Sequence, residues 1–161
     1  MLALSNSVDA QTYSTVHNFS ATNDNGSGSY TNRDGANPYA ALLLADGVLY
    51  GTSFSGGDAG VGTLFKVNTD GSGFTNLHSF TGSSSEITAG PLAISGNTLY
   101  GTYPRDGSAH GGSVFKVNTD GSGYTVLKEF VGSYSDGLYP IARYCQMLCL
   151  GTKRIQSKFY F

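Results

Sequence analysis

The sequence predicts an all-β fold: a partial β-propeller-like array with two complete four-stranded antiparallel blades plus flanking strands. The first observation is a stretch that occurs twice, at residues 65–75 and 115–125, with an offset of 50 residues. The second is that Gly-rich turns separate short, mostly alternating apolar runs. The third is that only 12% of the residues are charged while 23 are Gly, which is typical of short strands joined by many turns. Four strands in each 50-residue period match one propeller blade.

The first full repeat covers residues 38–80. Asp46-Gly47 is expected to be a two-residue hairpin turn, because both central positions of a type I′ turn need φ > 0. Gly51 lies within the second expected strand, and its missing side chain indicates that a ring or a backbone comes close there. The four expected strands are residues 38–44, 48–54, 62–68 and 74–80.

The second full repeat covers residues 91–130 and copies this plan. A third copy begins at residues 139–142, and the repeat pattern is then lost. From residue 143 onward Cys, Gln and basic residues appear where the repeats avoid them, so we expect residues 143–161 to be a degenerate or non-native tail. The expected strands of the second repeat are residues 91–95, 98–103, 112–118 and 124–130.

The N-terminal part is expected to hold three pieces. Val8-Asp9-Ala10 has the small-residue pattern of a signal-peptidase site, so residues 1–10 are interpreted as a leader remnant. Residues 13–19 alternate and end like the last strand of a repeat, and the polar residues 20–37 are expected to form a long surface loop. The β-propeller-like repeats therefore occupy residues 11–142. Because two blades cannot close a propeller, we expect a fragment whose open blade edges favour self-association.

Charge and hydropathy exclude some classes of partner. Up to residue 142 the net charge is −6, and the basic residues are scattered, so no phosphate-tracking patch is formed and nucleic acid is excluded. No apolar run is long enough for a transmembrane segment. Cys145 and Cys149 lack the neighbouring His or Cys that a zinc site needs, so no metal or other cofactor is expected.

The repeated pattern joins Leu-Tyr-Gly-Thr, a Gly-Gly loop, Phe-Lys-Val-Asn-Thr-Asp-Gly-Ser-Gly with an aromatic residue, and a Leu-x-x-Phe ending. It closely resembles the GloVer-type tandem repeat of bacterial exported proteins, over residues 11–142. This resemblance implies a secreted or surface-attached β-propeller-like array. It supplies no catalytic residues.

Two features of the repeat have more than one interpretation. The Asn-Thr-Asp-Gly-Ser-Gly turn offers oxygen ligands at alternating positions, as calcium loops do, but a hydrogen-bonded Asp-Gly turn explains it better. The recurring aromatic residues are expected to pack between blades rather than to form a platform for sugar stacking. These aromatic residues are Tyr50, Phe65, Phe74, Tyr100, Phe115 and Tyr124.

The candidate ligand site is a loop face. In a propeller, the loop between the second and third strands shares a face with the connection between blades, and this face carries most candidate binding side chains. The ligand-binding candidates are Arg33, Asp34, Asp58, Arg105, Asp106 and His110, accompanied by Asp24. His17 and His78 hold one repeat position that Lys128 takes in the next copy, so side chains there are expected to face solvent.

The sequence favours a non-enzymatic binding or scaffolding module of an exported bacterial protein, with a glycan or a surface protein as the partner. The alternative is a fragment of a propeller-type polysaccharide-active enzyme, a lyase or a glycosidase. That alternative needs paired carboxylates from different blades, and Asp58 with Asp106 is the pair that the loops offer. No nucleophile elbow, zinc-protease motif or phosphate loop is present, so no catalytic residue is assigned.

Overall fold

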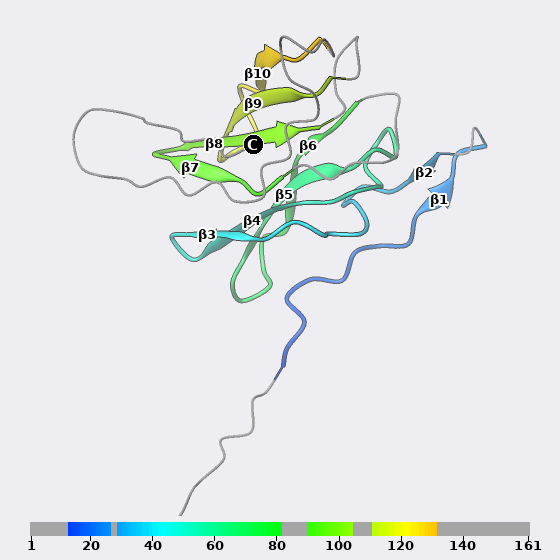
Figure 1. Ribbon diagram of the computed structural model, residues 1–161. Helices are drawn as coiled ribbons and strands as arrows, with labels where there is room; N and C mark the ends of the chain where they lie inside the picture. Colours follow the sequence, from blue (N-terminus) through cyan, green and yellow to red (C-terminus); the bar gives the residue numbers. More distant parts are fainter. Residues whose placement is uncertain (1–12, 27–28, 82–89, 105–110, 132–161) are drawn as a thin grey trace, which may run out of the picture.

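The computed structural model describes residues 13–26, 29–81, 90–104 and 111–131. Every regular element in these ranges is a β-strand, which confirms the all-β class (Figure 1). The strands form three antiparallel sheets of two, four and four strands, and none is closed. The strands are β1 (Asn23–Asp24), β2 (Tyr30–Thr31), β3 (Leu43–Ala45), β4 (Val48–Thr52), β5 (Thr63–Asn68), β6 (Thr75–Ser79), β7 (Ala93–Ser95), β8 (Thr98–Tyr103), β9 (Ser113–Asn118) and β10 (Thr125–Glu129).

The two four-stranded sheets are copies of one meander. The first sheet has the order β3-β4-β5-β6, and the second has the order β7-β8-β9-β10. Asp46 and Gly47 have φ of 49° and 76°, so the predicted turn between β3 and β4 is confirmed. In the turn between β7 and β8, Gly96 has a φ of 55°. In each sheet the first strand is shorter than expected, with three residues.

Gly51 and Gly101 lie under aromatic rings, as the sequence predicted for Gly51. A Cβ atom on Gly51 would lie 2.6 Å from Cζ of Phe65, which belongs to the paired strand β5. On Gly101 it would lie 2.5 Å from Cζ of Phe115. Because real Cβ atoms do not approach carbon this closely, each ring can lie flat on its strand only where the residue is glycine.

The core lies between the two four-stranded sheets, which are placed one over the other (Figure 1). Leu64 of the first sheet and Leu99, Phe115 and Val117 of the second are all fully buried. Two polar contacts join the layers. The Tyr103 hydroxyl donates to the Val61 carbonyl over 3.0 Å, and Lys66 Nζ donates to the Thr119 carbonyl over 3.2 Å.

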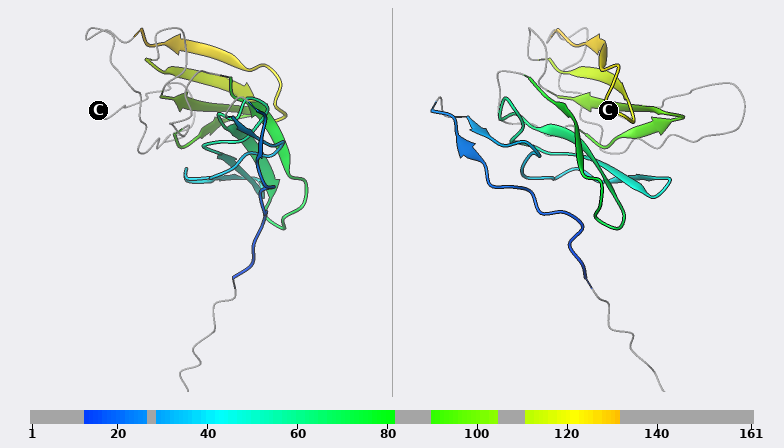
Figure 2. Two further views of the ribbon diagram at one scale, coloured as in Figure 1. Left: turned by 90° about the vertical axis from the view of Figure 1, so that its right-hand side faces the viewer. Right: turned by 180° about the vertical axis from the view of Figure 1, so that it is seen from behind.

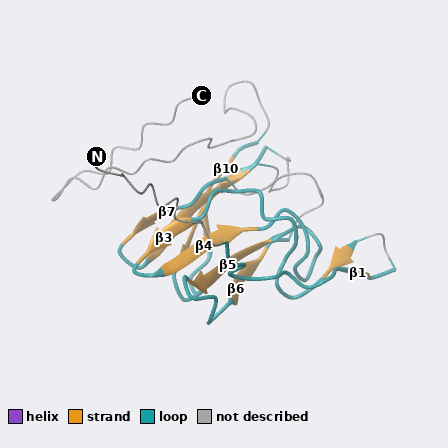
Figure 3. Ribbon diagram, turned by 90° about the horizontal axis from the view of Figure 1, so that it is seen from below, coloured by secondary structure: helices purple, strands orange, loops and turns teal. Residues whose placement is uncertain are grey.

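The flanks differ from the expectation. Residues 13–19 form no strand; they run along the first sheet on the side away from the second (Figure 1). No described strand pairs with this N-terminal segment, so it has no ladder of hydrogen bonds. The connecting segment, residues 20–37, was expected to be a loop but holds the two-stranded ladder β1–β2. Figure 3 shows this ladder projecting beyond the end of the larger sheets.

Candidate functional site

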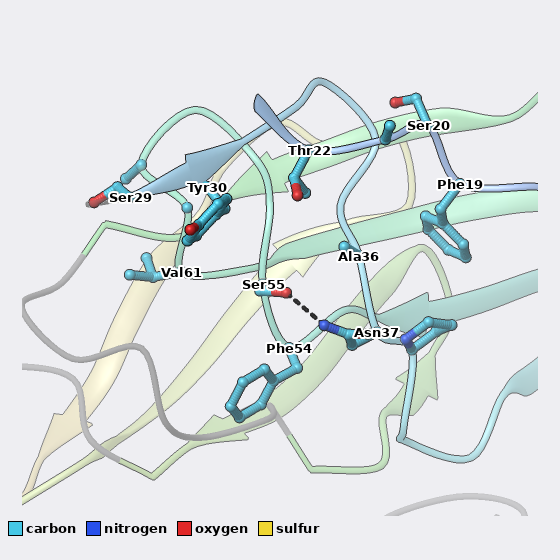
Figure 4. Close-up of a pocket in the computed structure, with 14 residues that line it drawn as sticks. Phe19, Ser20, Thr22, Ser29, Tyr30, Ala36, Asn37, Phe54, Ser55 and Val61 are labelled. Atoms are coloured by element: carbon cyan, nitrogen blue, oxygen red, sulfur yellow. Dashed lines mark hydrogen bonds between the residues drawn. The ribbon is translucent and has the colours of Figure 1, made fainter. Parts of the chain in front are cut away.

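A groove of about 830 Å³ lies where the connecting segment meets the loop 53–62 between β4 and β5 (Figure 4). These are two of the loops that the sequence assigned to a common face. The two loops meet at the groove. Its lining residues are Phe19, Ser20, Ala21, Thr22, Ser29, Tyr30, Ala36, Asn37, Pro38, Phe54, Ser55, Ala59, Gly60 and Val61.

Asn32 holds the two loops together. Its Oδ1 accepts hydrogen bonds from the backbone N–H of Gly35 at 2.9 Å and of Gly57 at 3.1 Å. Its Nδ2 donates to the carbonyls of Ser20 and Gly35. A Cβ on Gly56 would lie 2.3 Å from this Oδ1, so only glycine fits against the amide. One amide side chain thus positions both walls of the groove.

The floor of the groove is a short bridge between the two loops. Ala36 and Ser55 exchange two backbone hydrogen bonds, at 2.7 and 3.0 Å. Beneath them, Ser53 Oγ and Thr63 Oγ1 lie 2.9 Å apart and buried, and Thr63 Oγ1 donates to the Asp34 carbonyl. Hydroxyl groups satisfy the loop backbone here, which keeps an irregular segment fixed.

The lining of the groove is aromatic, aliphatic and neutral polar. Phe19 and Tyr30 lie toward opposite ends of the view in Figure 4, and the Asn37–Ser55 contact lies between them. Asn37 Nδ2 donates to Ser55 Oγ over 2.9 Å. Tyr30 keeps 58% of its surface exposed. None of the lining residues is Asp, Glu, Lys, Arg or His. The groove therefore offers ring faces, hydroxyls and amides, and no charge.

Of the six ligand-binding candidates, Arg33, Asp34 and Asp58 lie within the described ranges, as does the accompanying Asp24, and none of these four lines the groove. Arg33 is exposed, and its carbonyl accepts from Asn76 Nδ2. Asp58 is exposed, with its backbone N–H 3.4 Å from Ser79 Oγ. Asp24 accepts from the Gly26 N–H at 2.9 Å, within the β1–β2 turn. Arg105, Asp106 and His110 lie outside the described residues, as do Cys145 and Cys149.

Asp34 binds the N-terminal segment to the connecting segment. Its carboxylate accepts from the Ser20 hydroxyl, from the Ser20 N–H at 2.8 Å and from His17 Nε2 at 3.3 Å. Partial desolvation raises the pKa of Asp34, but these hydrogen bonds outweigh it and hold the pKa below its usual value. These hydrogen bonds give Asp34 a structural role.

The Asp-Gly-Ser-Gly turns are closed by their own side chains. Asp70 Oδ1 accepts from the N–H of Ser72 at 2.8 Å and from its hydroxyl at 2.7 Å, and Asp120 does the same with Ser122. These hydrogen bonds lower the pKa of both carboxyl groups. Within the described part of the chain no three His, Cys, Asp or Glu side chains cluster as a metal site would need. The turn interpretation accounts for these residues.

Aromatic residues pack in two matching clusters. His78 stacks on Tyr124 with centroids 3.8 Å apart and planes at 8°, and Phe80 meets Phe115 edge to face at 5.6 Å. His17 on Phe74 and Phe19 against Phe65 repeat the arrangement, at 3.7 and 5.3 Å. The prediction that the repeat aromatics pack between blades holds for Tyr50, Phe115 and Tyr124, which belong to the core between the two four-stranded sheets. Phe65 and Phe74 pack against the N-terminal segment instead, and Tyr100 is half-buried. The expectation of solvent-facing side chains at His17 and His78 was wrong, because each ring lies flat on the next layer.

Sequence reasoning missed the groove because it searched for titratable side chains. The groove residues are small, hydroxyl-bearing or aromatic, and such residues occur in most loops of this chain. The usable signal was positional. The loop 53–62 and the polar connecting segment were expected on one face, and Tyr30 and Phe54 are the aromatic residues that these loops contribute to the lining.

A family model described as the Gloeobacter/Verrucomicrobia repeat matches residues 4–149 of the chain. This match covers most of the sequence and confirms the GloVer-type resemblance. No curated protein and no solved structure matches the chain. No helix in the described ranges is long and apolar enough to cross a membrane.

Proposed function

Because the chain belongs to the Gloeobacter/Verrucomicrobia repeat family, we propose that it is a non-enzymatic repeat module of an exported bacterial protein, which binds neutral saccharides in the groove. Its two four-stranded sheets act as blades of a β-propeller-like array. The module presents the groove, and the array acts as the scaffold. A surface glycan is the partner that fits this chemistry.

The uncharged lining of the groove is the observation that carries the proposal. A pyranose ring has apolar C–H faces and a rim of hydroxyl groups. The rings of Phe19, Tyr30 and Phe54 suit the faces, and the amide and hydroxyl groups of Asn37 and Ser55 suit the rim. Ligand sites typically combine such apolar walls with a few fixed polar groups. The groove volume of about 830 Å³ falls in the range of known ligand pockets.

The same lining supports binding over catalysis. Glycoside hydrolysis uses two carboxyl groups on either side of the scissile bond, and none of the residues lining the groove carries a carboxylate. Of the carboxylates near the groove lining in sequence, Asp58 is exposed and does not line the groove, and Asp34 is engaged by Ser20 and His17. A binding module therefore fits this groove better than a lyase or a glycosidase.

The test is a screen of the full chain against immobilised neutral glycans, followed by isothermal titration with each hit. Tyr30→Ala removes an exposed ring of the groove and is expected to weaken binding about fivefold, because one ring contact is worth about 1 kcal/mol. Tyr13→Ala is the matched control, because Tyr13 is 91% exposed and does not line the groove.

Two results contradict the proposal. Equal loss of binding in the Tyr13 and Tyr30 variants would place the sugar outside the groove. Release of shorter sugars or of new reducing ends from a neutral polysaccharide would favour the enzyme alternative. Export is tested separately by fractionating bacterial cells that produce the chain from its native gene. Recovery in the cytoplasm alone would overturn the exported location.

A further inference from the structure

The interface between the two four-stranded sheets shows how one repeat covers another. Four apolar side chains of the first repeat are almost completely buried at this interface. Their exposed fractions are 6% for Tyr50, 0% for Leu64, 8% for Leu77 and 2% for Phe80. The turn after β9 also fits closely, since a Cβ on Gly121 would lie 2.8 Å from the Leu77 carbonyl.

The second sheet has equivalent residues on its outer side, each 50 positions after its counterpart in the first repeat. We call this surface the tail face; it consists of Tyr100, Val114, Leu127 and Phe130. None of the four is buried, and Leu127 is 50% exposed where its counterpart Leu77 is 8% exposed. The tail face is therefore an apolar surface with the residue types of a buried interface. Figure 2 shows β10 at the end of the stack opposite the N-terminal segment.

The first sheet carries the complementary positions on its own outer side. The head face consists of Leu42, Leu44, Leu49 and Val67. Leu92, Leu99 and Val117 hold the equivalent positions at the interface between sheets, and they are buried to 4% exposure or less. Here, however, Leu42 is 52% exposed, whereas Val67, which lies beside the N-terminal segment, is 3% exposed. A hollow of about 330 Å³ lies between the N-terminal segment and the head face.

We propose that the tail face of one chain docks on the head face of a second copy, as the first sheet docks on the second within one chain. In this contact β10 takes the place that the N-terminal segment holds in the second copy. Phe130 replaces Phe19 against Phe65, and Leu127 replaces Val16 beside Gly71, whose added Cβ would lie 2.7 Å from the Val16 carbonyl.

The N-terminal segment and β10 compete unequally for the head face. The N-terminal segment has no described strand as a partner, whereas β10 arrives already paired with β9 and brings the rest of its sheet. The incoming sheet also fills the hollow beside the head face with Tyr100 and Val114. The contact buries more apolar surface than the N-terminal segment does, and burial of apolar surface is the main driving force of association.

A second copy is the occupant that the sequence supports. Within the chain, the second sheet covers the first with residues of its Phe-Lys-Val-Asn-Thr-Asp-Gly-Ser-Gly stretch and the following aromatic residue, namely Phe115, Val117 and Tyr124. The first sheet carries the same stretch at its head face, so every copy presents a matching surface. The contact joins two different surfaces, so a dimer still has one free head face and one free tail face. Assembly can therefore continue head to tail.

The test uses light scattering after size exclusion on the full chain over a range of concentrations. The wild-type chain is expected to form concentration-dependent dimers and larger species. Phe19→Ser weakens the contact of the N-terminal segment with the head face, and this is expected to raise the association constant about tenfold. Leu42→Asp on the head face and Leu127→Asp on the tail face are matched in exposure, and each alone is expected to be monomeric.

Mixing the last two variants distinguishes head-to-tail contact from other arrangements. The Leu127→Asp chain keeps an intact head and the Leu42→Asp chain an intact tail, so the mixture is expected to form 1:1 dimers that do not extend. Tyr30→Asp, an exposed substitution in the groove, is expected to leave assembly unchanged. The proposal is overturned if the wild-type chain and the Phe19→Ser variant both stay monomeric. Self-association of either Asp variant alone also overturns it.

Discussion

β6 and β10 carry the same Leu-x-x-Phe ending and differ in their surroundings. Leu77 and Phe80 are 8% and 2% exposed, because the second sheet packs over them. Leu127 is 50% exposed at the position equivalent to Leu77. The strands pair with their neighbours in the same way, each with one register shift. The difference in burial therefore comes from the next repeat and not from the strand itself.

This comparison explains why the repeat ends on apolar residues. A single four-stranded sheet has an apolar side that it cannot cover alone, and each new repeat covers the one before it. On the head face, the N-terminal segment partly takes the place of a neighbouring repeat. It supplies His17 and Phe19 to the first aromatic cluster but leaves a hollow beside Leu49 and Val67.

The largest expected effect is a contrast between equivalent phenylalanines. Phe80→Ala removes a ring packed against Tyr103 and Phe115, at 4.7 and 5.6 Å, and is expected to lower the free energy of unfolding by about 3–5 kcal/mol. Phe130→Ala removes a partly exposed ring and is expected to cost less than about 1 kcal/mol. Urea unfolding at low protein concentration measures both. Equal losses would show that the tail face is covered in the isolated chain.

A second contrast concerns the two glycines that touch a preceding strand. Gly71 and Gly121 have φ of 86° and 90°, so alanine strains both equally. The added Cβ would collide with the N-terminal segment in one case and with the paired strand β6 in the other. We expect Gly121→Ala to cost about 3 kcal/mol and Gly71→Ala about 1–2 kcal/mol, because the unpaired segment can shift. Thermal unfolding checks this order, and the reverse order would contradict it.

The smallest effect is a pH-dependent one at Asp34. Because hydrogen bonds hold its pKa below the usual value, its contribution to stability is complete above about pH 4 and is lost as the pH falls through the lower folded-state pKa. Asp34→Asn is therefore expected to cost about 1 kcal/mol at pH 7 and almost nothing at strongly acid pH. Unfolding of both chains across this range tests it, with Asp58→Asn as an exposed control. A loss that does not depend on pH would show that the carboxylate charge is irrelevant.

Features that one or two neighbouring residues determine were predicted well from the sequence. The Asp46-Gly47 turn needs two positive φ angles, and Gly51 needs a missing side chain under a ring, so one residue type determines each. In the second sheet a ring also lies over Gly101, but the equivalent turn has a positive φ at Gly96 and not at Asn97. The sheet order also follows, since short turns can join only neighbouring antiparallel strands.

Features that depend on contacts distant in sequence were not predicted. His17 and His78 were expected in solvent because Lys128 replaces them, but each ring stacks on an aromatic residue that belongs to the next layer. The groove depends on Asn32 bridging two loops, and its neutral lining carries no titratable side chain to mark it. Residues 13–19 alternate as a strand would, yet the described part of the chain offers them no strand to pair with.

The most direct test of this account is amide hydrogen exchange of the full chain at low concentration. β6 and β10 are equivalent in sequence position and pairing, so a difference in exchange reports on the layer that covers them. We predict that the amides of β6 exchange much more slowly than those of β10. Equal protection of the two strands would contradict the claim that each repeat is stabilised by the one that follows it.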